Sequence, residues 1–244
     1  MTKNKLKVYH GIILIILAAI DIFFIAGYLG RWFGFFGTLL SELILLALAV
    51  GVVFVFGGDF KKVFPVRRPK ACQVFGTFVL WLGTLFVMMI VAMIMLLLFP
   101  QEMAEVSEGI SSAIRSVPFV VAFAVVVIAP AICEEEVFRG VFFNSIFKPE
   151  QNKWITILVT AAVFGAFHGS IWRFFPTFFL GIAMGYVLME TGNMFYTMLF
   201  HGINKRIVPE RKAADANCDD HDGSRMRGDR DASDDGEHGI WRRV

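Results

Sequence analysis

Four ionisable side chains stand close together in a part of the chain that is otherwise apolar. The stretch between residues 118 and 147 is dominated by aliphatic and aromatic residues, yet it contains Glu134, Glu135, Glu136 and Arg139. An ionised group at membrane depth costs at least ~2.5–3.5 kcal/mol on insertion scales, so it is rarely tolerated there without a partner or a chemical role. This cluster is therefore the strongest candidate for a functional site in the sequence.

The spacing within the cluster separates two roles. Residues four apart lie on one face of a helix, so Glu135 and Arg139 can pair, whereas Glu134 is rotated away by about 100° and stays outside that pair. We assign Glu135 and Arg139 to a structural or orienting ion pair. Glu134 is the candidate for proton chemistry, as the general base that activates a water molecule. The alternative is an ion-pair network without a catalytic role.

Two histidines on other predicted helices come to a similar depth. Counted from the same side of the membrane at ~1.5 Å per residue, Glu134, His168 and His201 lie at ~20, ~21 and ~12 Å. One buried polar residue is often a packing residue, but three at matching depth predict a shared cavity. His168 could then orient the water held by Glu134 or share its proton.

The last predicted helix carries a second hydrogen-bond donor beside its histidine. His201 and Asn204 are three residues apart and so lie on neighbouring faces. Donors aimed at one point stabilise the oxyanion of a peptide-bond intermediate by ~3–4 kcal/mol each. Two variants stay open: zinc held by Glu134, His168 and His201, although the sequence has no HExxH pattern, and Cys133 as a nucleophile, for which a small buried residue is the preferred interpretation.

Composition indicates what surrounds these residues. The 244 residues are 57% hydrophobic with 27 Phe, and the mean hydropathy is +0.65. These values are typical of polytopic membrane proteins rather than soluble domains. A net charge of +2 gives no reason to expect a nucleic-acid partner, and three cysteines without a CxxC pair support neither a disulfide framework nor a zinc ribbon.

The predicted fold is an all-α, polytopic membrane bundle of about seven transmembrane helices, the last one truncated. A span needs ~20 residues, and six apolar windows come close to or exceed that length before a seventh begins at Asn193: residues 11–29, 37–57, 74–99, 118–147, 154–168 and 172–189. The first window is expected to be a retained helix rather than a cleaved signal. Ten Lys and Arg in the N-terminal segment and the even loops against three in the alternate loops predict a cytoplasmic N-terminus in the cell membrane.

The chain divides into three predicted parts. Residues 1–117 hold the N-terminal transmembrane helices and loops, residues 118–204 the helical core with the candidate site, and residues 205–244 a hydrophilic tail. The tail has 19 charged residues in 40, so it is expected to be disordered. Since it leaves the seventh helix only twelve residues, ~18 Å at ~1.5 Å per residue, we favour a replaced, non-native end over a half-helix that stops inside the protein.

Three motifs resemble the CPBP (also called ABI) family of intramembrane proteases, which includes the prenyl-protein CaaX endopeptidases and bacteriocin-processing enzymes. Two glutamates, three residues and an arginine are matched by Glu134, Glu135 and Arg139. The pattern Phe-x-x-x-His is matched by Phe164 and His168, and similarity continues from there to His201. The resemblance covers roughly residues 118–204.

The resemblance implies a glutamate-dependent endopeptidase that hydrolyses a peptide bond near the membrane. The first motif glutamate and the second-motif histidine, here Glu134 and His168, would activate water, and the last histidine and an asparagine would form the oxyanion hole. The family asparagine usually stands four residues after the histidine; here that position is Lys205, with Asn204 one residue earlier. No cofactor is expected, with zinc as the alternative, since such enzymes are often classed as metalloproteases.

Other interpretations remain open at this point. The chain could be a non-catalytic immunity or binding protein of the same fold, which Lys205 and the tail favour, or a proton-coupled transporter. The expected partners are the bilayer and a peptide or membrane-protein substrate. Gly181 and Gly185 form a GxxxG pattern that predicts close helix packing. Asp21 and Glu42 have no partner in the sequence and are interpreted as packing or access-path groups.

Overall fold

The computed structural model describes residues 6–102, 104 and 117–206 of the chain. These residues belong to one compact unit, Met1–Pro209, and are helices and connecting turns with no strand among them. The all-α prediction is therefore confirmed. The predicted tail lies outside the described residues apart from Lys205 and Arg206, which continue the last helix.

The N-terminal helices form an antiparallel pair. The first long helix is built from α1 (Val8–Ile20), the π-helical turn η1 (Asp21–Ile25) and α2 (Ala26–Phe33), and it is followed by α3 (Phe35–Val55). Gly34 joins the two with φ +56°, a left-handed conformation that favours glycine. A short helix, α4 (Phe60–Val63), follows α3. This reversal at Gly34 brings Asp21 and Ser41 together although they are twenty residues apart.

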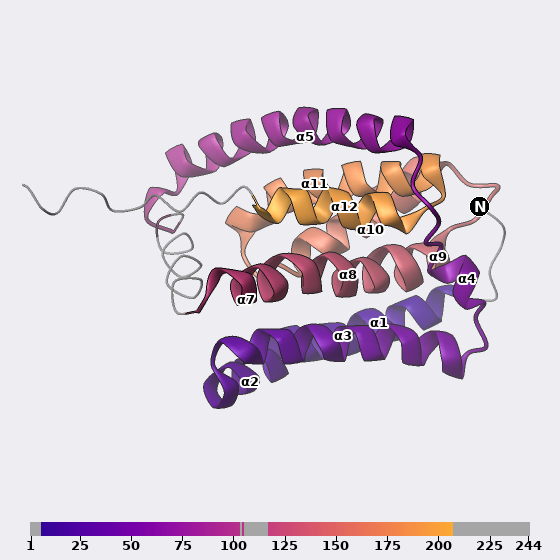
Figure 1. The fold of residues 1–244 in the computed structure, drawn as a ribbon, viewed down its shortest axis with the longest axis horizontal. Helices are drawn as coiled ribbons and strands as arrows, with labels where there is room; N and C mark the ends of the chain where they lie inside the picture. Colours follow the sequence, from indigo (N-terminus) through magenta and orange to yellow (C-terminus); the bar gives the residue numbers. More distant parts are fainter. Residues whose placement is uncertain (1–5, 103, 105–116, 207–244) are drawn as a thin grey trace, which may run out of the picture. The chain divides into compact units, whose positions relative to one another are not determined.

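Helix α5 (Ala71–Leu98) lies on the other side of the molecule. It packs against α11 and α12, whereas α1 and α3 pack against the central helical run described next (Figure 1). Many side chains of α5 are exposed although they are large and apolar, including Phe75, Phe86 and Leu97. An exposed surface of this kind is expected where a helix faces lipid.

The central run is helical from Phe119 to Ile146 but alternates between α and π turns. It comprises, in order, α7 (Phe119–Phe123), η2 (Ala124–Ile128), α8 (Ala129–Glu135), η3 (Glu136–Phe142) and α9 (Phe143–Ile146). Single π turns inside α-helices often occur at functional sites. Here the change from α8 to η3 falls between Glu135 and Glu136, inside the ionisable cluster.

The last three helices lie between the central run and α5 (Figure 1). Helix α10 (Lys153–Ala166) has 14 residues, ~21 Å at ~1.5 Å per residue, and turns back through residues 167–170 into α11 (Ile171–Thr191). Gly181 lies so close to α10 that a Cβ there would be 2.9 Å from Ala161 Cα, and a Cβ at Gly185 would be 3.3 Å from Ile157. The predicted close packing at the GxxxG pattern is confirmed.

Helix α12 (Met194–Arg206) is fixed at its start by the segment before α5. The Asn193 side chain accepts a hydrogen bond from Arg67 N at 3.0 Å and donates to Arg67 O at 3.1 Å. The Tyr196 hydroxyl accepts from Lys70 N at 2.7 Å and donates to Gln73 Oε1 at 2.8 Å. These bonds set the height of His201 and Lys205 two and three turns further along.

The six predicted apolar windows all fall on helices. Four helical segments of the described chain are long and apolar enough to cross a membrane: Val8–Phe33, Phe35–Val55, Ala71–Leu98 and Ile171–Thr191. Lys153–Ala166 is apolar but shorter. A helical membrane bundle therefore fits the chain, while the number of seven crossings stays a prediction.

Candidate functional site

A fully buried ion pair forms the base of the site. Arg139 Nη1 donates to Glu135 Oε1 at 2.8 Å, and neither side chain has any exposed surface. The guanidinium also lies 4.3 Å from the ring centre of Phe164 and reaches Gly181 O at 3.4 Å. The pairing predicted from the i, i+4 spacing is therefore present, and it joins the central run to α10 and α11.

His201 lies between the two neighbouring glutamates. Its Nδ1 is 3.1 Å from Glu135 Oε1 and its Nε2 is 3.8 Å from Glu134 Oε2, with 1% of the residue exposed. A carboxylate only accepts hydrogen bonds, so Nδ1 must carry the hydrogen that it shares with Glu135. The Phe164 ring, 5.8 Å from the imidazole, covers it from another side. Both nitrogens thus face carboxylates.

Glu134 points away from the buried pair, as the spacing predicts. Its Oε1 accepts a hydrogen bond from Lys205 Nζ at 3.1 Å. The two side chains are 14% and 24% exposed, so this is a largely buried contact rather than a surface pair. Lys205 thereby neutralises the carboxylate that we expect to act as a base. It stands at the position where the CPBP family usually has an asparagine.

His168 lies in the turn after α10 rather than inside a helix. Its Nδ1 is 3.0 Å from Phe164 O, and a carbonyl can only accept, so Nδ1 carries the hydrogen of the neutral ring. Nε2 is then unprotonated and can accept a hydrogen bond from water. A non-helical backbone at membrane depth is tolerated where it lines a cavity, which explains why the chain can turn here.

A cavity of about 420 Å³ lies over Glu134 and His168. It has two walls. One comes from the central run, the α10–α11 turn, the start of α11, and α12, and comprises Glu134, Phe138, Phe167, His168, Gly169, Arg173 and Lys205. The other comes from the N-terminal helices and comprises Ile22, Phe23, Ala26, Thr38, Ser41, Glu42 and Leu45. The volume suits a small ligand or part of a peptide.

The structure brings some predicted site residues to this cavity and leaves others outside it. Glu134 and His168 line it, and His201 contacts Glu134 from behind. Asn204 is half-buried in α12 and is not among the lining residues, whereas its neighbour Lys205 is. Cys133 is a buried free thiol that does not line the cavity.

The N-terminal wall carries polar groups that the sequence did not connect to the site. Ser41 Oγ donates to Asp21 Oδ2 at 2.6 Å, and Asp21 has no exposed surface. Glu42 is 8% exposed, and its Oε2 has no hydrogen-bond partner among the described residues. The signal that could have revealed them is the glycine turn after Phe33, because it folds α3 back along α1 and η1.

No group of three or more His, Cys, Asp or Glu side chains suited to a metal ion occurs in the described ranges. The Nδ1 of His201 is occupied by Glu135, and its Nε2 is 3.8 Å from Glu134 Oε2. Lys205 also holds one oxygen of Glu134. The donor set proposed for zinc, Glu134, His168 and His201, is therefore not presented as an open metal site.

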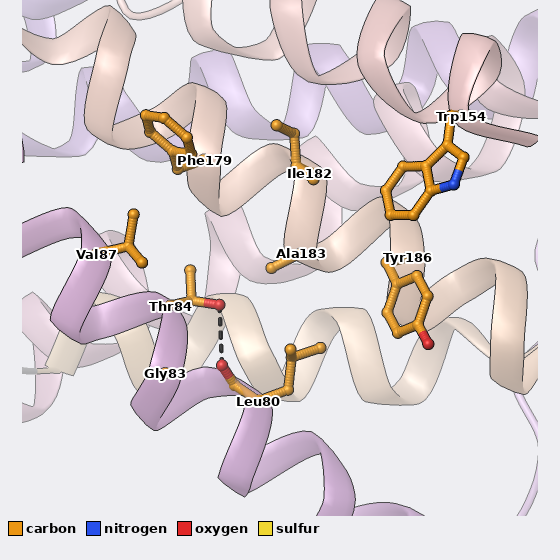
Figure 2. A pocket seen from close by; sticks show the side chains of 9 residues that line it. All are labelled: Leu80, Gly83, Thr84, Val87, Trp154, Phe179, Ile182, Ala183 and Tyr186. Atoms are coloured by element: carbon orange, nitrogen blue, oxygen red, sulfur yellow. Dashed lines mark hydrogen bonds between the residues drawn. The ribbon is translucent and has the colours of Figure 1, made fainter.

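A second cavity, of about 380 Å³, is apolar and has a different setting. It lies between α5, α10 and α11, and Figure 2 shows aliphatic and aromatic side chains around it: Leu80, Val87, Trp154, Phe179, Ile182 and Tyr186, with Gly83, Thr84 and Ala183 between them. The Thr84 hydroxyl donates back to Leu80 O at 2.9 Å, so its hydrogen is not available to a ligand. Among the described residues, its lining includes no carboxylate, imidazole, amine or thiol, and its polar side chains are Thr84, Trp154 and Tyr186.

The comparisons with known proteins agree with the motifs. Residues 116–207 match the family described as type II CAAX prenyl endopeptidase Rce1-like. The predicted resemblance to the CPBP and CaaX proteases is thereby confirmed, and the matched segment contains Glu134, Glu135, Arg139, His168 and His201. Neither the curated proteins nor the solved structures that were searched gave a match. The family and the apolar helices together indicate a multi-pass membrane protein of the protease type.

Proposed function

We propose that the chain is an intramembrane endopeptidase of the CaaX type in which Glu134 activates water. The observation that carries this proposal is the position of Glu134, which lines a 420 Å³ cavity together with His168 while His201 lies 3.8 Å behind it. A carboxylate can take a proton from water, and the unprotonated Nε2 of His168 can accept the second hydrogen of the same water. The water oxygen would then attack the peptide carbonyl.

Buried residues next to Glu134 support this chemistry without lining the cavity. Glu135 and Arg139 fix each other, and Glu135 holds His201, whose Nε2 lies 3.8 Å from Glu134 Oε2. The family resemblance implies that His201 and Asn204 stabilise the oxyanion. For His201 this requires a hydrogen on Nε2 as well, because the Nδ1 hydrogen is shared with Glu135. Since Lys205 rather than Asn204 lines the cavity, we propose that its ammonium supplies the positive charge at the oxyanion once substrate has displaced it from Glu134.

The test is cleavage of a quenched fluorescent peptide library by the purified protein in nanodiscs. Glu134→Gln should lower kcat/KM by ~10²–10⁴-fold, the range for loss of a general base, with the melting temperature nearly unchanged. Glu136→Gln removes a neighbouring carboxylate that does not line the cavity and serves as the matched control. Equal turnover by Glu134→Gln and the wild type would refute the proposal.

Metal chelators test the alternative in which a zinc ion is bound by Glu134, His168 and His201. In our proposal, turnover continues in the presence of EDTA or 1,10-phenanthroline, and metal analysis of the purified protein finds less than one zinc per ten chains. Loss of turnover that only zinc restores would favour the metal-dependent alternative.

A second candidate function is a non-catalytic binding protein, favoured by the bond between Lys205 and Glu134. Lys205→Met separates the two. If the ammonium stabilises the oxyanion, this variant loses at least tenfold in kcat. If Lys205 instead holds Glu134 inactive, the wild type cleaves nothing and Lys205→Asn gains measurable turnover.

We further propose that the N-terminus faces the cytoplasm. Cys72 provides the test because it is exposed just after the basic segment between α3 and α5. In a Cys218→Ser background, a membrane-impermeant maleimide should label Cys72 only after the cells are permeabilised. Labelling of intact cells would reverse the orientation.

A further inference from the structure

The N-terminal wall of the cavity offers hydrogen-bond acceptors. The hydrogen of the Ser41 hydroxyl is used by Asp21 Oδ2 at 2.6 Å, so the Ser41 oxygen turns lone pairs outward. Asp21 Oδ1 is buried without a partner among the described residues. A ligand that binds at Ser41 and Glu42 is therefore expected to supply hydrogens.

Glu42 is the central residue of this wall. It lines the cavity and is 92% buried, given its exposed fraction of 8%, yet its Oε2 has no partner in the described part of the chain. Buried polar atoms in folded proteins are nearly always hydrogen-bonded, and an unpaired buried charge is costly. A carboxylate kept in this state beside an open cavity is suited to a ligand that brings both hydrogens and positive charge.

The cations of the cavity do not satisfy Glu42. Lys205 Nζ is bound to Glu134, and among the described residues neither Lys205 nor Arg173 forms an ion pair with Glu42. A metal ion does not fit either, since the described ranges hold no group of three suitable ligands. An organic cation from outside the chain would supply both the hydrogen bond and the positive charge that Glu42 lacks among the described residues.

We propose that Glu42, supported by Ser41 and Asp21, forms a subsite for the ammonium or guanidinium group of a lysine or arginine side chain in the bound peptide. This inference rests on the proposed function and adds a substrate class to it. Glu42 and Glu134 line the same cavity from opposite walls, so a peptide whose scissile bond lies at Glu134 can extend a basic side chain to Glu42. The apolar residues Ile22, Phe23 and Leu45 would enclose its methylene stem.

The first experiment measures binding without cleavage. N-acetyl-lysine amide and N-acetyl-norleucine amide have stems of similar length but differ in charge, and neither contains a bond between two residues. With the wild-type protein in nanodiscs, competition against a fluorescent peptide should give the lysine probe a Kd at least tenfold lower. In Glu42→Gln the two probes should differ by less than twofold.

The second experiment measures cleavage. A peptide series that places one lysine or one norleucine at each position should show at least a tenfold preference in kcat/KM for lysine at one position. Glu42→Gln should remove this preference and still cleave the norleucine peptide. Glu136→Gln is the control that removes a carboxylate elsewhere, and Glu42→Asp should keep part of the preference.

The two experiments fail in different ways. Equal binding of both probes by the wild type, or a lysine preference that survives Glu42→Gln, overturns the subsite. Preferential binding of the lysine probe without cleavage of any peptide overturns the protease function but keeps Glu42 as a cation site. Because the wild-type comparison needs no variant, the inference stays falsifiable even where Glu42→Gln does not fold.

Discussion

The two walls of the cavity differ in how their buried carboxylates are paired. In the wall that belongs to residues 116–207, Glu135 is bound by Arg139 and His201, and Glu134 by Lys205. In the wall formed by the N-terminal helices, Glu42 forms no ion pair with the described residues, and Asp21 has only the Ser41 hydroxyl. The paired charges of the first wall therefore stabilise the core. The unpaired carboxylate of Glu42 in the second wall costs stability, and the proposed cationic ligand would remove that cost.

The largest expected effect comes from breaking the pair in the first wall. Arg139→Met removes the cation that Glu135 needs, and loss of one partner of a buried pair costs about 3–5 kcal/mol because the other charge stays buried. Denaturant titration in detergent should show this loss in the free energy of unfolding. Arg173→Met is the control, since Arg173 has no ion pair among the described residues. Equal losses in both variants would remove the distinction between paired and unpaired charges.

The next prediction concerns the close contact between α10 and α11 at Gly181, where packing rather than an ion pair holds two helices together. Gly181→Ala places a methyl group 2.9 Å from Ala161 Cα, so α10 and α11 must separate, at a cost of about 1–3 kcal/mol. Gly51 in α3 has no atom within 4 Å of an added Cβ, and Gly51→Ala should stabilise by up to ~1 kcal/mol through helix propensity. Thermal melting of both variants measures the contrast. A stable Gly181→Ala protein would show that this contact is loose.

The same comparison explains how much the sequence could predict. The pair of Glu135 and Arg139 follows from spacing within one helix, and the contact at Gly181 follows from a local pattern. The bond between Lys205 and Glu134 spans 71 residues and depends on how α12 is docked, which no local spacing encodes. From the sequence alone, Lys205 is only a departure from the family pattern.

The N-terminal wall was harder to predict for a related physical reason. Asp21 and Glu42 are single carboxylates in apolar helices, and only the turn at Gly34 places α3 beside η1. Hydropathy predicts that both helices cross the membrane, but it does not give their rotation about their own axes. The π turn at Asp21 changes that rotation further, because it adds a residue to a helical turn.

A smaller effect is expected at the join between the two regions. Tyr196→Phe removes the hydroxyl that accepts from Lys70 N and donates to Gln73 Oε1, so α12 loses part of its attachment to the segment before α5. Hydrogen bonds of this kind contribute about 1 kcal/mol each. We expect a loss of about 1–2 kcal/mol in the free energy of unfolding, measured by denaturant titration. Because Tyr196→Phe keeps the ring, the loss is assigned to the hydroxyl, and an unchanged free energy of unfolding would contradict the prediction.

The smallest effect, and the most informative one, is expected for Glu42→Gln. The amide has nearly the same shape as the carboxylate but no charge, so the substitution removes the cost of an unpaired buried ion while keeping an acceptor. We expect the melting temperature to stay the same or to rise slightly. Glu135→Gln makes the identical chemical change in the opposite wall, where it leaves Arg139 without its anion, and its melting temperature should fall. If Glu42→Gln is instead as destabilising as Glu135→Gln, then the carboxylate of Glu42 is already bound by other groups of the protein. A carboxylate with partners in the fold does not need a cationic ligand, and this result would contradict the proposed subsite.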